Sequence, residues 1–101
     1  MHDIILQFSE RVSLLNAMSE LGRHQEFLKT HLTRSAGSSQ RVIADLGALK
    51  EVDTSALSLL LHLDRQVREK LGQPLVIRAA PPNLLSLARL SSLSDVLHWE
   101  P

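Results

Sequence analysis

The feature that most constrains the fold is a helical pattern from Thr54 to Leu71, set between two short apolar segments. Leucines recur along one side of this pattern at the spacing of an amphipathic helix. Gly72 and then Pro74 follow it, which is a common signal for a helix end. The flanking segments, residues 41–46 and 75–79, are short, apolar and rich in β-branched residues, as expected of buried strands. A strand, a helix and a further strand in this order predict parallel strand neighbours.

The rest of the chain supplies further elements around this unit. In chain order we predict strands at residues 4–8 and 12–18 joined by a tight turn, a first helix from Gly22 to the serine-rich segment 35–39, another helix after Pro81 and Pro82, and an edge strand or a tucked segment at 96–99. The predicted fold is α/β, in the order β-β-α-β-α-β-α-(β). It is one domain over residues 1–101, with a mixed β-sheet whose parallel central strands are flanked by α-helices.

Composition excludes several classes of function. Eleven basic residues balance eleven acidic ones, so no long-range field attracts nucleic acid or anionic lipid. The chain has no cysteine, which excludes disulfides and thiolate metal sites, and its three aromatic residues offer no platform for stacking bases. No segment approaches the roughly 20 apolar residues of a membrane span, and the start does not resemble a signal peptide. We therefore expect a cytoplasmic protein.

Candidate catalytic and metal-binding residues are few. His24 and His31 are seven positions apart, too far along one helix to share a metal ion, and we expect them on the helix surface. His62 lies within the leucine-rich helix and is either buried or part of an interface. Asp45 and Asp53 are carboxylates, but no nucleophile or phosphate-binding loop accompanies them. We expect neither an enzyme nor a bound cofactor or metal.

The start of the leucine-rich helix is the most informative site. Asp53 or Thr54 can cap the helix, because a side-chain oxygen there accepts from a free backbone N–H and contributes about 1 kcal/mol. Capping alone is one interpretation of Asp53. The other is functional: a hydroxyl on Thr54 or Ser55 lies where the helix dipole favours a phosphate, whose charge of about −2 would change a docking surface.

These residues carry a family resemblance. Ile43-Ala44-Asp45-Leu46 followed by Val52-Asp53-Thr54-Ser55-Ala56-Leu57 resembles the signature of STAS domains, which occur in anti-sigma-factor antagonists and in transporter subunits. Further along, residues 57–64 and 87–97 resemble the MlaB-like STAS subunits of bacterial lipid-asymmetry ABC transporters. The resemblance extends from about residue 41 to 97. It departs from the family pattern at Ala56, where most members have glycine, and at Thr54, where phosphorylated antagonists usually have serine.

The resemblance implies a non-catalytic accessory subunit that binds the ATPase (MlaF-like) of a phospholipid-transporting ABC complex. Such a subunit would be cytoplasmic and peripheral to the inner membrane through its partner. We expect the interface at the start of the helix and on the apolar positions that lie off its main stripe, although a neighbouring helix of the same molecule could cover those positions instead. The predicted partner-binding residues are Asp53, Thr54, Ser55, Ala56, Leu59, His62 and Leu63.

Two alternatives stay open. The chain could be an anti-sigma factor antagonist regulated by phosphorylation at Thr54 or Ser55. It could also hold a small ligand or a lipid between strand and helix ends, although its compactness argues against a lipid cavity.

Overall fold

The computed structural model describes residues 3–31 and 41–100, so the predicted serine-rich loop at 35–39 lies outside the described residues. Within them, a four-stranded sheet has the order β1-β3-β5-β6. Its strands are β1 (Asp3–Gln7), β3 (Arg41–Asp45), β5 (Val76–Arg78) and β6 (His98–Trp99). A second short ladder joins β2 (Arg11–Val12) to β4 (Glu51–Val52).

Every strand pair among the described residues is parallel. The predicted α/β fold with parallel central strands is confirmed, and the expectation of a mixed sheet gives way to a parallel one. β3 lies between β1 and β5, as its apolar sequence predicts, and Val42, Ile43 and Ala44 are each fully buried. The short β4 had no counterpart in the predicted order.

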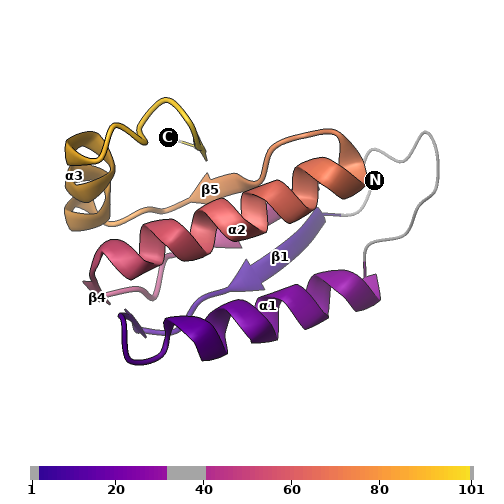
Figure 1. Ribbon diagram of the computed structural model, residues 1–101, viewed down its shortest axis with the longest axis horizontal. Coiled ribbons are helices and arrows are strands. Elements are labelled where there is room, and N and C mark those ends of the chain that lie inside the picture. Colours follow the sequence, from indigo (N-terminus) through magenta and orange to yellow (C-terminus); the bar gives the residue numbers. More distant parts are fainter. Residues whose placement is uncertain (1–2, 32–40, 101) are drawn as a thin grey trace.

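The helices are α1 (Ala17–His31), α2 (Thr54–Leu71) and α3 (Pro82–Leu90). Figure 1 shows α1 and α2 side by side across one face of the sheet, both beginning at the same end of the molecule, with α3 near that end. Parallel strands require this return of the chain, because each crossover must carry it back to the edge where the next strand starts. The C-terminal ends of the central strands and the first turns of α1 and α2 therefore meet at one end.

One apolar core lies between the helices and the sheet. Alternate strand residues, among them Leu6, Val42, Ala44 and Ile77, contribute to it from the sheet. All three helices also contribute, through Leu28, Leu57, Leu60, Leu63, Val67, Leu84 and Ala88. Burying one such leucine side chain stabilises the fold by about 1.5–3 kcal/mol, so this shared core holds the helices in place.

α2 begins and ends where the sequence predicts. Asp53 is its N-cap, and its carboxylate accepts from the Ser55 N–H at 2.8 Å. Gly72 takes a left-handed conformation with φ of 70°, and its N–H donates to the Arg68 carbonyl at 2.9 Å. A residue with a Cβ is strained in that conformation, which is why glycine stands there.

The predicted strand at 12–18 is wrong beyond Val12. The Ser13 N–H donates to the Asn16 side chain at 2.9 Å, and the Ser13 carbonyl accepts from the Ala17 N–H at 2.8 Å, so the chain turns directly into α1. α1 therefore starts five residues before Gly22. β1 and β2 do not form a hairpin either, since each pairs with a later parallel strand.

Candidate functional site

The first turn of α2 is held against the β2 ladder. β4 leads directly into α2, and the Asp53 N–H donates to the Val12 carbonyl at 3.4 Å, so β2 holds the chain at the helix start. The side chain of Thr54 is exposed, whereas those of Asp53 and Ser55 are half-buried. The predicted helix start is thus accessible at the surface of the monomer.

The Asp53 carboxylate makes two hydrogen bonds to two different segments. One oxygen accepts from the Ser55 N–H at 2.8 Å, and the other accepts from the Leu14 N–H at 3.0 Å. These N–H donors, Leu14 first, hold the pKa of Asp53 below its usual range. Asp53 is therefore ionised at neutral pH. It both caps α2 and fixes the loop that precedes α1.

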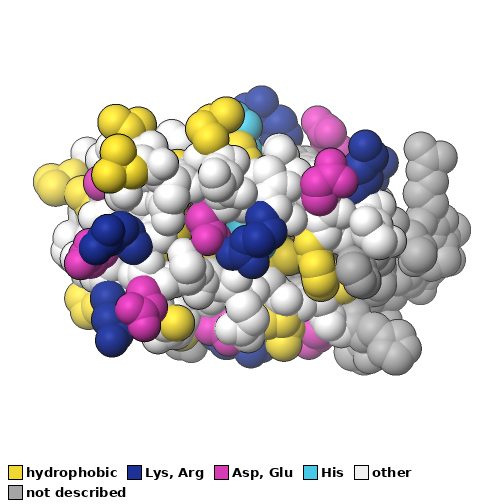
Figure 2. Space-filling view, turned by 90° about the horizontal axis from the view of Figure 1, so that it is seen from below, with side chains coloured by type: hydrophobic (Ala, Val, Ile, Leu, Met, Phe, Trp, Pro, Cys, Tyr) yellow, Lys and Arg dark blue, Asp and Glu magenta, His cyan; other side chains and the backbone are white. Residues whose placement is uncertain are grey.

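This loop and the first turn of α1 present an apolar patch, which we define as Leu14, Leu15 and Met18. Their exposed fractions are 78%, 92% and 79%, although all three are large hydrophobic residues. Single exposed leucines are ordinary, but three large apolar side chains exposed close together in the sequence make this surface a candidate interface. Figure 2 shows hydrophobic side chains exposed at the end where α1 and α2 begin in Figure 1.

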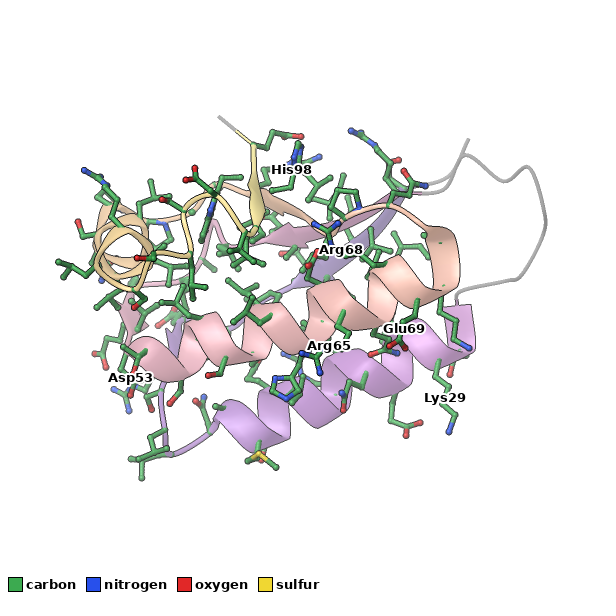
Figure 3. All side chains as sticks on the ribbon, turned by 45° about the horizontal axis from the view of Figure 1, so that its top comes forward. Lys29, Asp53, Arg65, Arg68, Glu69 and His98 are labelled. Atoms are coloured by element: carbon green, nitrogen blue, oxygen red, sulfur yellow. The ribbon has the colours of Figure 1, made fainter. Side chains whose placement is uncertain are left out.

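A row of exposed polar residues, which we call the exposed stripe, runs along α2 from its first turn. Thr54, Ser58 and His62 lie one turn apart, and all three are exposed. A ring nitrogen of His62, Nδ1, lies 2.8 Å from the Ser58 carbonyl, which fixes the ring along the helix surface. Figure 3 shows Asp53 at the start of α2, and Arg65 and Glu69 farther along it. The stripe therefore changes from hydroxyl and imidazole groups near the patch to charged groups beyond it.

Three of the predicted partner-binding side chains are not accessible. Ala56, Leu59 and Leu63 are 3%, 2% and 0% exposed, and they belong to the core. Their prediction as contact residues is wrong, because packing within the molecule covers these three side chains. Asp53, Thr54, Ser55 and His62 stay accessible, and their part in partner binding remains a prediction.

The sequence reasoning missed the apolar patch. It assigned Leu14, Leu15 and Met18 to a strand, where alternate residues would have been buried. Asn16 carried the signal that could have corrected this, since asparagine favours the position just before a helix and disfavours strands. With α1 starting at Ala17, the leucines before it fall in a capping turn at the surface.

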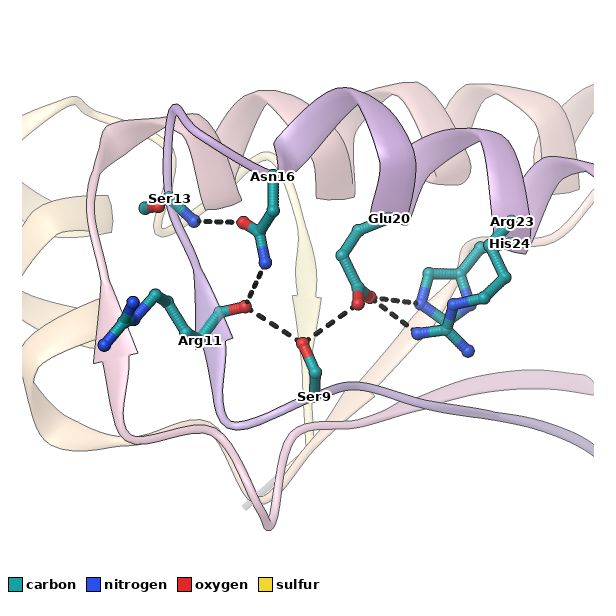
Figure 4. Close-up of polar contacts among 7 residues, drawn as sticks. All are labelled: Ser9, Arg11, Ser13, Asn16, Glu20, Arg23 and His24. Atoms are coloured by element: carbon teal, nitrogen blue, oxygen red, sulfur yellow. Dashed lines mark hydrogen bonds and ion pairs between the residues drawn. The ribbon is translucent and has the colours of Figure 1, made fainter.

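A buried polar cluster joins the start of α1 to the chain before β2, close to the apolar patch (Figure 4). Glu20 and His24 are only 8% and 2% exposed. The Glu20 carboxylate lies 2.9 Å from the Ser9 hydroxyl, 2.8 Å from an Arg23 guanidinium nitrogen and 3.1 Å from His24 Nε2. The His24 ring also stacks on Phe8, with ring centroids 4.3 Å apart. The cluster joins α1 to the segment between β1 and β2, and so supports the loop that carries the patch.

His24 was predicted on the helix surface. This prediction is wrong, because the side chain is buried. Burial and the nearby Arg23 guanidinium hold the pKa of His24 below its usual range, against the opposing influence of Glu20. The lowered pKa favours the neutral ring at pH 7. The Ser9 hydroxyl contacts Glu20 and not the imidazole, so His24 is not placed to take a proton from it. The cluster is structural.

Asp45 and Asp53 do not form a carboxylate pair. Asp45 accepts from the Gly47 N–H at 2.9 Å and lies 3.5 Å from the Gln7 amide nitrogen, so it shapes the turn after β3. Among residues 3–31 and 41–100, no three histidine or acidic side chains converge as metal ligands. None of the helices in that part of the chain has a stretch long and apolar enough to cross a bilayer.

A family model described as "Mlab, STAS domain" matches residues 6–98. The matched region includes the Asp53 cap, the apolar patch and all three helices. No curated protein matches the chain.

Proposed function

The chain belongs to the STAS domain family in its MlaB-like form, and from this we propose that it is a non-catalytic accessory subunit that binds the ATPase of a phospholipid-transporting ABC complex. In this role it is a cytoplasmic protein that reaches the inner membrane only through its partner. Its contact surface is the start of α2 together with the apolar patch.

The observation that carries the proposal is the exposure of Leu14, Leu15 and Met18 beside the capped helix start. Protein interfaces combine an apolar centre with a polar rim. Here the patch is the centre, and the hydroxyls of Thr54 and Ser58 lie on the rim. Each large apolar side chain that a partner covers contributes about 1.5–3 kcal/mol, enough for a specific complex of moderate affinity.

A docking role also agrees with the chemistry of the site. The carboxylate of Asp53 is occupied by two backbone donors, and the buried Glu20 and His24 bind each other. Neither group is poised to act on a substrate. The surface around the apolar patch is rigid. Asp53 holds it through Leu14, and the Glu20 cluster holds the start of α1.

The test is binding of the purified chain to the ATPase encoded in the same bacterium, measured by calorimetry. We expect Thr54→Arg and Leu15→Glu each to weaken binding by about 30-fold or more, the effect of losing a hot-spot contact of roughly 2 kcal/mol. Glu69→Arg changes an exposed residue near the other end of α2 and serves as the matched control. Wild-type affinity in both site variants, with the fold intact by circular dichroism, would exclude this surface.

The anti-sigma factor antagonist remains the second candidate, because the Thr54 hydroxyl is exposed where a kinase could reach it. A phosphate on Thr54 would lie next to the ionised carboxylate of Asp53, and the two negative charges would repel each other. This repulsion favours permanent docking over a reversible switch. Incubation with the cognate kinase and ATP, followed by intact-mass measurement, distinguishes the two candidates: one added phosphate that is absent in the double variant Thr54→Val/Ser55→Ala supports the antagonist.

A further inference from the structure

Two more large apolar side chains are exposed away from the docking end, at the free edge of β1. Ile5 and Phe27 are each 40% exposed. Both line a groove between β1 and α1, together with Leu6, Gln7, Arg23 and His24. The groove has a volume of about 210 Å³, below the roughly 300 Å³ at which small-molecule pockets begin. Protein side chains suit it better than a bound metabolite.

Among the described residues, no second strand pairs with β1 along this edge. β1 is the first strand in the sheet order and pairs, within the described residues, with β3 alone. The Phe8 N–H donates to the Asp45 carbonyl of β3 at 3.3 Å. Because backbone groups alternate between the two edges of a strand, the N–H and C=O of Ile5 and Gln7 point away from β3. They form a row of hydrogen-bonding groups ready for a further strand.

The edge also lacks several of the features that can prevent such pairing. Its five residues include no proline and no lysine, and they pair with β3 without a bulge. The single charge, on Asp3, is already bound to Arg41 at 3.0 Å. Beside the groove, Arg23 is likewise bound to Glu20 at 2.8 Å.

We propose that the occupant of this edge is β1 of a second copy of the chain, paired antiparallel about a twofold axis at Ile5. Two identical edges can pair symmetrically only when antiparallel, and the axis at Ile5 uses the whole strand. Ile5 then faces its own counterpart, and Asp3 faces Gln7 of the second copy, so no like charges meet. Two four-stranded sheets become one continuous sheet of eight strands.

Charge and shape both favour a second copy. The formal net charge is zero, so two copies do not repel at a distance. Figure 2, seen from the α1 side, shows positive and negative side chains interspersed and not gathered by sign. The twofold axis also brings the two α1 helices to the same face of the joined sheet, where Phe27 of each copy lies near the axis and loses its exposure.

The dimer is expected to be weak. A five-residue edge with two flanking side chains is smaller than the roughly 800 Å² per partner of a standard interface. The monomer and dimer therefore exchange as the concentration changes. The surface is separate from the docking end, so this inference stands or falls independently of the proposed function.

Sedimentation equilibrium over a range of concentrations tests the proposal. The mass should rise from 11.3 kDa toward twice that value. Ile5→Lys should abolish the rise, as should Ile5→Pro, which removes no hydrogen bond within the monomer because that N–H points to the free edge. Leu15→Lys, the matched change in the apolar patch, should leave the dimer intact.

Cross-linking tests the register. The chain has no cysteine, so Ile5→Cys introduces a single thiol. Directly opposed residues of a hydrogen-bonded antiparallel pair have Cα atoms about 5.5 Å apart, within the range of a disulfide. Mild oxidation should link Ile5→Cys into dimers and leave Glu69→Cys, exposed on α2, as monomers.

Three results would overturn the proposal. The first is a monomer mass at every concentration, which would leave the edge to an extended segment of another protein. The second is a dimer that survives Ile5→Lys and disappears in Leu15→Lys. The third is equal cross-linking of Ile5→Cys and Glu69→Cys.

Discussion

Asp53 shows how one side chain can define a site. Its role as a helix cap is readable from the sequence, because it depends on the residues next to it. Its second hydrogen bond, to the Leu14 N–H, joins positions 39 residues apart and could not be predicted before the fold was known. The apolar patch was missed for the same reason. The position of its loop depends on the contact with Asp53, which is distant in the sequence.

Two substitutions of Asp53 distinguish the effect of its hydrogen bonds from the effect of its charge. We expect Asp53→Ala to lower the free energy of unfolding by about 1–2 kcal/mol, as loss of a cap does, and Asp53→Asn to lower it less, because an amide oxygen also accepts a hydrogen bond. Urea unfolding measures both. Equal stability of the wild type and Asp53→Ala would show that the carboxylate does not cap α2.

The pH dependence of this site follows from the same hydrogen bonds. The pKa of Asp53 is lowered in the folded state, so the stabilisation by its charge is present above the unfolded value of 3.8. It is lost as the pH falls through the folded value. The stability difference between wild type and Asp53→Asn should therefore persist at pH 5–7 and shrink in stronger acid. A difference that grows on acidification would reverse the assigned sign.

His24 should make the fold sensitive to milder acid. Its pKa is lowered on folding, so the unfolded chain binds a proton that the folded chain does not, and stability falls as the pH drops below 6.5. The thermal midpoint should decrease between pH 7.5 and 5.5. His24→Gln should flatten this decrease, whereas His62→Gln, at an exposed position, should keep it. An unchanged slope in His24→Gln would contradict the role of the buried imidazole.

At the scale of elements, α2 was predicted over the same residues that the structure shows, and α1 was not. α2 has a cap, a regular leucine pattern and a terminal glycine, which all agree locally. α1 follows Val12 through a turn that contains Leu14 and Leu15. The apolar pattern of this turn predicts a strand, whereas Asn16 predicts a helix start, so the two signals conflict. β4, with two residues, is too short to leave a pattern and exists because β2 pairs with it.

Two glycines in the helical part of the chain should respond oppositely to alanine. Gly72 has φ of 70°, where a Cβ is strained even though no atom lies within 4 Å, so Gly72→Ala should destabilise by about 1 kcal/mol. Gly22 lies inside α1 with open space around it, so Gly22→Ala should stabilise by about 0.5–1 kcal/mol. Chemical denaturation of both variants checks the signs. A stabilised Gly72→Ala would contradict the assigned helix end.

At the scale of the whole molecule, the parallel topology separates two surfaces. The crossovers bring the first turns of α1 and α2 to one end, where the apolar patch lies, and within the part of the chain that the structure describes they leave one side of β1 without a strand partner. The fold class and the helix start were predictable, because they rest on local patterns and on the order of elements. Which leucines face solvent was not, because the burial of Leu59 and Leu63 depends on how the elements pack together.

Hydrogen–deuterium exchange of the chain, alone and bound to the ATPase, tests the docking surface most directly. We predict slower exchange on binding in peptides that cover residues 13–18 and 53–58, and little change in β6. Protection confined to other segments, with the start of α2 exchanging as in the free chain, would contradict docking through this end.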